Sequence, residues 1–264
     1  MARATGFTMT SKSIPDLAVV VPVHNESANL APLLEEIRAA LDGRIAFEIV
    51  YVDDGSGDET PGVLAELSAR HPPLRAFRHV RNCGQSAAVR TGVRMARAPL
   101  VATLDGDGQN DPADIPLLLE KYRAANGDDA RPLLIAGQRA QRRDTGLRRL
   151  SSRIANGVRA WLLDDATPDT GCGLKLFARD HFLALPFFDH LHRFMPALFI
   201  REGGRVLSVP VNHRPRERGQ SHYGVWNRLW VGIVDIAGVL WLKSRGKVPM
   251  VESILPEQGG DREH

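Results

Sequence analysis

Strand-like and helix-like segments alternate along the first half of this chain, and this alternation constrains the fold more than any other feature. The apolar, β-branched run Leu17–Val23 is typical of a strand buried in a parallel sheet. Residues 28–41 then place leucines and an isoleucine on one face at helical spacing. Further strands are predicted at 47–52, 74–79, 100–104 and 133–136, and further helices at 61–69, 85–96 and 112–124. The pattern indicates βαβ units, and so an α/β fold with a mainly parallel sheet flanked by helices.

The pattern changes after about residue 137. We expect an arginine-rich helix over 147–161, a loop at 164–173, a short strand at 174–177 and a helix near 190–202. Residues 206–213 are predicted to form an edge strand, because Pro210 cannot donate to a central ladder. Residues 224–243 are expected to form a helix that is apolar on most sides.

Composition limits the class of protein. The 264 residues are 43% apolar, enough for one substantial core, or two small ones. Net charge is only +3, but residues 137–160 hold seven Arg and one acid, and residues 212–247 hold seven Lys/Arg and two acids. Such basic clusters indicate an anionic partner, which is a phosphate, a nucleic acid or a membrane.

Two cysteines, Cys83 and Cys172, form no disulfide framework, and no Cys/His group has zinc spacing. We interpret Cys83 as a small packing residue without a redox role. The first residues lack the apolar core of a secretory signal, and no apolar run reaches the ~20 residues that a membrane span needs. A reducing, cytoplasmic compartment is therefore expected.

An acidic motif follows the apolar run at residues 100–104. Asp105 and Asp107 are two positions apart, which places both carboxylates on one side as the chain leaves a strand. Gly106 and Gly108 allow a large anionic ligand to approach the backbone. Carboxylates at this spacing, with the Gln109 carbonyl, suit Mg²⁺ or Mn²⁺ bound with a diphosphate. The alternative is an ordinary acidic turn.

Two other uses of this motif can be weighed from the sequence. A calcium loop that began at Asp105 would need Gly and an acid where Asn110 and Pro116 stand, so this use is excluded. An aspartyl-nucleophile phosphatase normally has Thr or Val where this chain has Gln109, which weakens that alternative but leaves it open.

Polar motifs occupy the expected carboxyl ends of successive strands, at residues 19–26, 52–60, 81–88 and 104–110. In this order and spacing they resemble the inverting family 2 glycosyltransferases of the GT-A fold. Within that family, residues 81–88, 169–177, 193–196 and 210–221 resemble the polyprenyl-phosphate sugar transferases, such as dolichyl-phosphate mannose synthases and undecaprenyl-phosphate aminoarabinose transferases. The resemblance covers roughly residues 16–245.

The resemblance implies a donor site and a metal site. The nucleoside would contact the following residues: Pro22, His24, Glu26, Asp53 and Asp54. Asp54 would accept from a base N–H, while Asn82 and Gly84 would border the donor diphosphate. The Mn²⁺ or Mg²⁺ ligands would be Asp105, Asp107 and Gln109, with Asp105 also at the donor and Asp107 acting in catalysis.

The acceptor implied by the resemblance is a polyprenyl phosphate. Its phosphate is largely a dianion at neutral pH and needs positioning and charge neutralisation more than a general base. We expect Arg139 and Arg148 to bind it, supported by Arg149, Arg216 and Arg218, although about half of these arginines would belong to a solvated basic face. Asp169 would orient the acceptor or sugar, or simply cap a turn.

The predicted function is transfer of a sugar from a nucleoside diphosphate sugar to a polyprenyl phosphate at the cytoplasmic face of the membrane. A UDP-sugar is favoured, with GDP-mannose as the other donor. The alternatives are a family 2 enzyme with a soluble or protein acceptor, and a basic nucleic-acid-binding protein. The latter leaves the carboxylate motifs unexplained and lacks a recognisable motif, so no nucleic acid partner is expected.

The predicted organisation is a catalytic domain over 14–215, a basic loop and amphipathic helix over 216–250, and disordered tails at 1–13 and 251–264. Residues 229–242 would lie on an anionic membrane surface, with Trp at the headgroup level, or in a protein interface such as a homodimer. Many members of this group continue into membrane spans that this chain lacks, so a membrane-protein partner is a further expectation.

Overall fold

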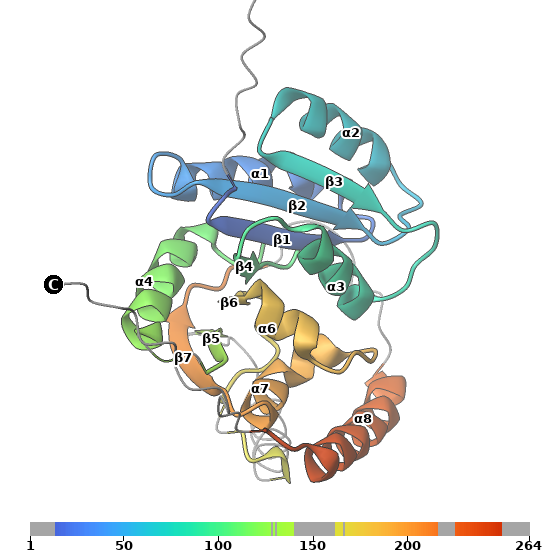
Figure 1. Ribbon diagram of the computed structural model, residues 1–264. Coiled ribbons are helices and arrows are strands. Elements are labelled where there is room, and N and C mark those ends of the chain that lie inside the picture. Colours follow the sequence, from blue (N-terminus) through green and yellow to red (C-terminus); the bar gives the residue numbers. More distant parts are fainter. Residues whose placement is uncertain are drawn as a thin grey trace, which may run out of the picture.

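A mainly parallel sheet with helices on both faces organises the protein (Figure 1). The computed structural model describes residues 14–127, 129, 131–139, 162–165, 167–215 and 225–249, with side chains described from residue 232 onward in the last range. Within these residues, seven strands form one sheet in the order β3-β2-β1-β4-β6-β5-β7. The predicted α/β fold is confirmed.

The first half alternates as its pattern predicts. Its elements are β1 (Leu17–Val23), α1 (Ser27–Leu41), β2 (Phe47–Asp53), α2 (Thr60–Arg70), β3 (Leu74–Arg78), α3 (Gln85–Met95), β4 (Leu100–Thr103), a short 3-10 turn η1 (Pro112–Asp114) and α4 (Ile115–Asn126). Each predicted strand and helix is present within two or three residues. The helix predicted over 112–124 begins as the separate turn η1, whose first residue, Pro112, follows the Asp111 cap.

The second half adds β5 (Leu133–Arg139), β6 (Lys175–Ala178), α6 (Arg179–Ala184), α7 (Leu191–Arg201), β7 (Arg205–Val211) and α8 (Val225–Arg245). The edge position predicted from Pro210 is confirmed, because β7 ends the sheet order. The sequence patterns did not predict α6. The arginine-rich helix expected over 147–161 and the tails expected at 1–13 and 251–264 lie outside the described residues.

The order and direction of the strands indicate where a ligand-binding crevice is expected. The strands β1, β2, β3 and β4 are parallel, whereas β6 runs antiparallel to both β4 and β5. The chain leaves β1 toward β2 and β3, and then returns to the other side of β1 as β4. Ligands of such sheets bind beyond the carboxyl ends of the strands at this reversal. The carboxyl ends of β1 and β4 are therefore the expected binding region.

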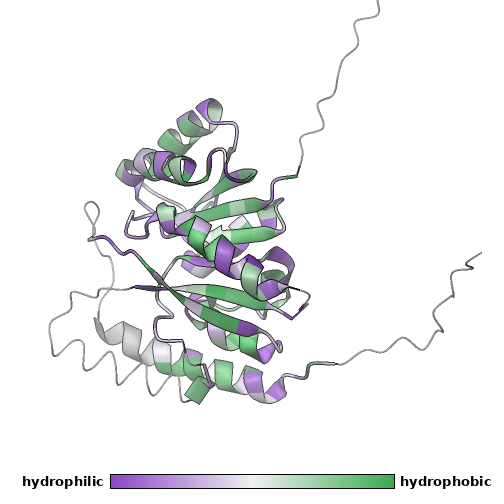
Figure 2. Cartoon of the chain, turned by 90° about the vertical axis from the view of Figure 1, so that its left-hand side faces the viewer, coloured by the Kyte–Doolittle hydropathy of each residue, from purple (hydrophilic) through white to green (hydrophobic). Residues whose placement is uncertain are grey.

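Both faces of the sheet are covered. In β1, Val19 and Val21 pack into the core beneath α1, α2 and α4, while Ala18 and Val20 face the core beneath α3, α6 and α7. The strand is apolar throughout because successive side chains point to opposite, equally buried faces. Figure 2 shows the strands mostly in the hydrophobic colour, with hydrophilic residues on the helices around them.

Candidate active site

Loops from four strands converge at the carboxyl edge of the sheet. Gly55, after β2, has a φ of +70°, and a Cβ at this position would overlap the backbone of Arg81 and Asn82. Gly106, after β4, approaches Pro22 and Val23 so closely that a Cβ would overlap Val23. The glycines of both motifs are thus required for the loops to pack together.

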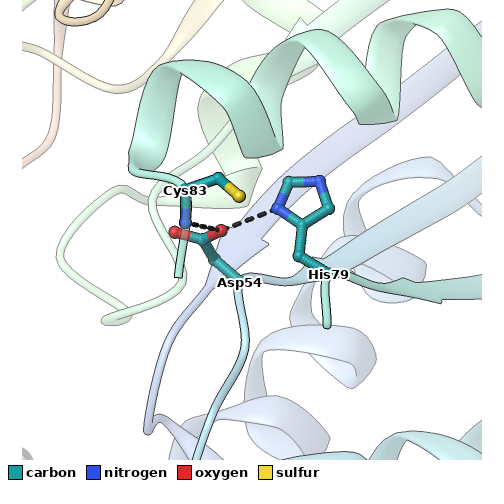
Figure 3. Close-up of side chains that lie close together, drawn as sticks. All are labelled: Asp54, His79 and Cys83. Carbon is teal, nitrogen blue, oxygen red and sulfur yellow. Dashed lines mark hydrogen bonds and ion pairs between the residues drawn. The ribbon is translucent and has the colours of Figure 1, made fainter. Parts of the chain in front are cut away.

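Asp53 and Asp54, both predicted to contact the nucleoside, are buried and form hydrogen bonds or ion pairs with other residues of the chain. Asp53 accepts from the Ser56 backbone N–H at 2.9 Å and pairs with Arg78 at 3.1 Å. Asp54 Oδ1 accepts from His79 Nδ1 at 2.7 Å and from the Cys83 backbone N–H at 2.9 Å (Figure 3).

Asp54 also fixes the start of α3. Its Oδ2 accepts from the Gly84 backbone N–H at 2.8 Å. Gly84, the residue before α3, has a φ of +88°, a conformation that favours glycine. Asn82 Oδ1 accepts from the same N–H at 3.2 Å. Cys83 is exposed, so its interpretation as a packing residue is wrong: the loop presents it to solvent.

The loop after β1 is tied to the loop after β2. His24 Nδ1 lies 3.0 Å from the Asp54 carbonyl oxygen, and the Glu26 backbone N–H donates to Thr60 Oγ1 at 3.1 Å. The Glu26 carboxylate accepts from Asn29 Nδ2 at 2.5 Å. His24, Glu26 and Asp54 therefore lie on one rim of the crevice.

Asp105 and Asp107 lie on the other rim. Asp105 Oδ1 accepts from Gln85 Nε2 at 2.7 Å, and Asp107 Oδ1 accepts from the Gln109 backbone N–H at 3.1 Å. Burial and the neighbouring charge of Asp107 raise the pKa of Asp105 to about 6, against the opposing charges of Lys175 and Arg139. Two carboxylates that repel each other at a half-buried site favour a bound cation.

Gln109 completes an oxygen-donor set. The side-chain Nε2 of Gln109 donates to the backbone carbonyl oxygen of Arg214 at 3.3 Å. The backbone N–H of Arg214 donates in turn to the backbone carbonyl oxygen of Gln109 at 2.9 Å. The first contact orients the side-chain amide, and the second ties the Gln109 backbone to the segment that carries Arg214. Two carboxylates and one amide carbonyl are ligands that suit Mg²⁺ or Mn²⁺, so the residues fit the predicted metal.

A pocket of about 380 Å³ opens beside Asp105. It is lined by parts of β1, α3, β4, β6, α7 and the 171–173 loop, and its polar wall includes Gln85, Asp105, Lys175, His192 and Arg193. Pro22, which was predicted beside the base, lines this pocket. A Cβ on Gly173 would overlap the Asp105 carboxylate, so the loop approaches the acid as closely as a backbone can.

Arg139, predicted at the acceptor phosphate, is held by Asp169. Its Nε and Nη2 donate to the two oxygens of Asp169 at 2.6 and 2.7 Å, and its backbone N–H donates to Oδ2 at 3.2 Å. The pair is largely buried, with side-chain exposures of 17% and 9%. This assigns Asp169 a partner and fixes the guanidinium plane close to Gly171. Arg148, Arg149, Arg216 and Arg218 lie outside the described residues.

Lys175 and His192 were not identified from the sequence as site residues. Lys175 is 3% exposed, and its ammonium donates to the carbonyls of Thr170 and Cys172. Burial lowers its pKa, although nearby thiol and carboxyl groups oppose this shift. Burial also lowers the pKa of His192 well below its usual range, so its ring is neutral at pH 7, with Nδ1 2.7 Å from Ser86 Oγ.

Comparison with known families gives one clear match. The family model described as glycosyl transferase family 2 matches residues 18–184. The chain is 34% identical over 231 residues to a dodecaprenyl-phosphate galacturonate synthase of Rhizobium johnstonii, covering 86% of this chain and 67% of that protein. It is 36% identical over 217 residues to an undecaprenyl-phosphate 4-deoxy-4-formamido-L-arabinose transferase of Edwardsiella ictaluri, covering 81% and 65%. The chain thus spans about two thirds of the length of these relatives.

Solved structures share the fold. A glucosyl-3-phosphoglycerate synthase of Mycobacterium tuberculosis, in complex with Mn²⁺, UDP-glucose and phosphoglyceric acid, aligns with a TM-score of 0.63 at 18% identity, covering 89% of this chain and 81% of that one. A mannosyltransferase of Pyrobaculum calidifontis, in complex with GDP-Man and Mn²⁺, aligns with a TM-score of 0.59 at 21% identity, covering 90% and 67%. These likenesses bear on the fold, which is the predicted GT-A arrangement.

Proposed function

Since the chain belongs to glycosyl transferase family 2, we propose that it transfers a sugar from a nucleoside diphosphate sugar to a polyprenyl phosphate, with inversion at the anomeric carbon. The observation that carries this proposal is the position of Asp105 at the reversal of strand order, close enough to Asp107 to feel its charge and beside a pocket with cationic groups on its wall. The relatives named for transfer to dodecaprenyl and undecaprenyl phosphate support this acceptor.

The donor lies across the carboxyl edge of the sheet in this proposal. The nucleoside contacts the rim formed by His24, Glu26, Asp53 and Asp54, and its diphosphate reaches Asn82 and Gly84. Neighbours with UDP-glucose or GDP-Man support both donor classes, of which we favour a UDP-sugar. The sugar then enters the pocket beside Asp105.

The metal ligands are Asp105, Asp107 and Gln109. These residues would hold Mn²⁺ or Mg²⁺, which would act as a Lewis acid and offset charge on the leaving diphosphate. Structural neighbours solved in complex with Mn²⁺ support a divalent metal in this fold. A phosphate oxygen of the acceptor attacks the anomeric carbon, the bond from that carbon to the diphosphate oxygen breaks, and the nucleoside diphosphate leaves with the electron pair.

Arg139 and Arg148 hold the acceptor phosphate in this proposal. Asp169 orients the Arg139 guanidinium through two parallel hydrogen bonds, which leaves its Nη1 edge for a phosphate. Lys175 adds positive charge to the pocket beside Asp105. His192 is neutral at pH 7, so it adds no charge to that wall.

We place the enzyme on an anionic membrane surface through α8. One side of this helix packs on the core, where Val239 is fully buried, and Asp235 pairs with His190 at 2.9 Å. The other side exposes Val234 and Trp241. The exposed Arg245 and Lys247 follow at its end, which suits a helix lying in a lipid interface, whereas the Lys243 ammonium donates to the Leu163 carbonyl. Among the described residues, no helix combines the length and apolar character needed to cross a bilayer.

Transfer from radiolabelled donors tests the proposal. The purified chain is incubated with UDP- or GDP-sugars, Mn²⁺ and undecaprenyl phosphate in detergent, and lipid-linked sugar is extracted. Asp107→Asn is expected to lower the rate on the order of 10²-fold or more. The exposed Asp180→Asn is the matched control and keeps the rate. Transfer to a soluble phosphorylated acceptor, with none to the lipid, would overturn the acceptor assignment.

A further inference from the structure

Three potential metal ligands from different parts of the chain lie close together at the start of α3. A carboxylate oxygen of Asp54, Nδ1 or Nε2 of His79 and Sγ of Cys83 all lie within 4.8 Å of one another. Asp54 follows β2, His79 follows β3, and Cys83 precedes α3 (Figure 3). We propose that these three residues bind a transition-metal ion of the Zn²⁺ type, at a site distinct from Asp105, Asp107 and Gln109.

The chemistry of the two donor sets separates their metals. The Asp105 site offers only oxygen atoms, which suit Mg²⁺ and Mn²⁺. The second set offers a thiolate, an imidazole nitrogen and one carboxylate, which favour Zn²⁺ or Co²⁺ over Mg²⁺. Three protein ligands leave a fourth tetrahedral position for water.

The geometry requires a small adjustment. Tetrahedral Zn²⁺ with ordinary bond lengths holds such ligand atoms roughly 3.3 to 3.6 Å apart. The His79 Nδ1 to Asp54 Oδ1 distance of 2.7 Å must lengthen slightly, and any wider separation, none of which exceeds 4.8 Å, must close to about 3.6 Å. Cys83 is exposed, and its thiol makes one weak hydrogen bond, to the Arg81 carbonyl at 3.3 Å. Rotation of this side chain supplies the movement.

The surroundings support the ligand form of each group. His79 Nε2 lies 2.9 Å from Thr91 Oγ1, a hydroxyl that donates or accepts. When Nδ1 binds the metal, the ring carries its proton on Nε2 and donates it to Thr91 Oγ1. Metal-bound histidines commonly donate their other ring N–H to a neighbouring oxygen atom in this way. Asp54 Oδ2 keeps the Gly84 N–H, so the carboxylate stays oriented. The Cys83 thiol releases its proton to solvent.

A bound ion joins the ends of β2 and β3 to the loop before α3. Asp54 and Gly84 also belong to the proposed donor site, so any effect of the ion on donor binding rests on the proposed function. Metal binding itself does not, so it is measured directly and without a transfer assay.

Cobalt absorption tests the site. The untagged chain of 264 residues is titrated with Co²⁺ in excess Mg²⁺, which fills the oxygen site. A thiolate-to-cobalt charge-transfer band is expected, and Zn²⁺ in equimolar amount should abolish it. The chain has only two cysteines, so a band can arise only from Cys83 or Cys172. Cys83→Ser should remove the band, and Cys172→Ala should keep it.

Thr91→Val adds a graded readout. Loss of the hydroxyl should weaken Co²⁺ binding on the order of 10-fold, because hydrogen bonds to the outer nitrogen of a metal-bound histidine contribute that much to affinity. Absence of a band in the wild-type protein would overturn the proposal. A band that persists in Cys83→Ser would also overturn it, since the remaining thiol, Cys172, lies beside the Asp105 pocket.

Discussion

Asp54 and Asp105 both end strands at the edge of the crevice, but their surroundings give them different chemistry. Asp54 accepts two backbone N–H groups and faces His79, so its charge is compensated by fixed donors. Asp105 receives one hydrogen bond from Gln85 and lies beside Asp107. Without a bound ion, Asp54 therefore links the loops after β2 and β3 to the start of α3, whereas Asp105 faces a second carboxylate, which favours a bound cation.

The raised pKa of Asp105, about 6, predicts a pH-dependent stability without metal. The pKa of Asp105 in the folded protein is above its ordinary value, so its contribution to the free energy of unfolding is largest below about pH 4. This contribution is lost as the pH rises through about 6. Asp105→Asn cannot ionise. Its free energy of unfolding in EDTA should exceed that of the wild type at about pH 7.5, and by much less at about pH 4, measured in urea.

Added Mn²⁺ is the control for that measurement. It should stabilise the wild type at the higher pH and leave Asp105→Asn nearly unchanged. A difference between the two proteins that stays constant with pH would contradict the assigned environment of Asp105.

The Arg139–Asp169 pair predicts a large coupling. Arg139→Ala removes the guanidinium that balances the buried Asp169 carboxylate and should cost about 3 kcal/mol of unfolding free energy. The double variant Arg139→Ala with Asp169→Asn should recover part of this loss. Arg131, which pairs with Asp129 at the surface, is the matched control, and its alanine variant should change stability little. Additive losses from the two substitutions would contradict the coupling.

At the scale of elements, α3 packs onto the sheet through a glycine. A Cβ on Gly92 would overlap Val20 of β1, so Gly92→Ala should destabilise the protein by about 1–3 kcal/mol. Gly62 lies in α2 with open space around it, and Gly62→Ala should stabilise by up to about 1 kcal/mol through helix propensity. Urea denaturation compares the two variants. If both variants changed the free energy of unfolding by the same amount, the close contact of Gly92 with Val20 would be contradicted.

The exposed side of α8 predicts membrane binding. Val234 and Trp241 are 67% and 61% exposed, and Val234→Glu or Trp241→Glu should abolish co-sedimentation with vesicles that contain anionic lipid. Val80, which is fully exposed after β3, supplies the matched control, since Val80→Glu adds the same charge elsewhere. Retained vesicle binding together with loss of a dimer in analytical ultracentrifugation would assign this face to a protein interface instead.

At the scale of the whole molecule, strand order decides which loops share the crevice. Residues 24–26, 53–58, 81–84 and 105–110 are far apart in sequence, and they meet because β1 lies between β2 and β4. The antiparallel β6 then brings the 171–173 loop and Lys175 to the same edge, next to Asp105. A single topology thus joins a carboxylate rim, suited to a metal, to a basic pocket, suited to a phosphate.

The sequence by itself determined the elements and the motifs at their ends. Apolar periodicity sets strand and helix, and the polar residues of Val52–Asp58 and Leu104–Asn110 follow directly where buried strands stop. Only the tertiary structure decided the pairings between these motifs. Asp169 engages Arg139, thirty residues away, and Asp54 meets both His79 and Cys83. Such contacts depend on strand order and loop approach, which local periodicity does not encode, so Lys175, His192 and the Asp54–His79–Cys83 cluster could not be predicted from spacing.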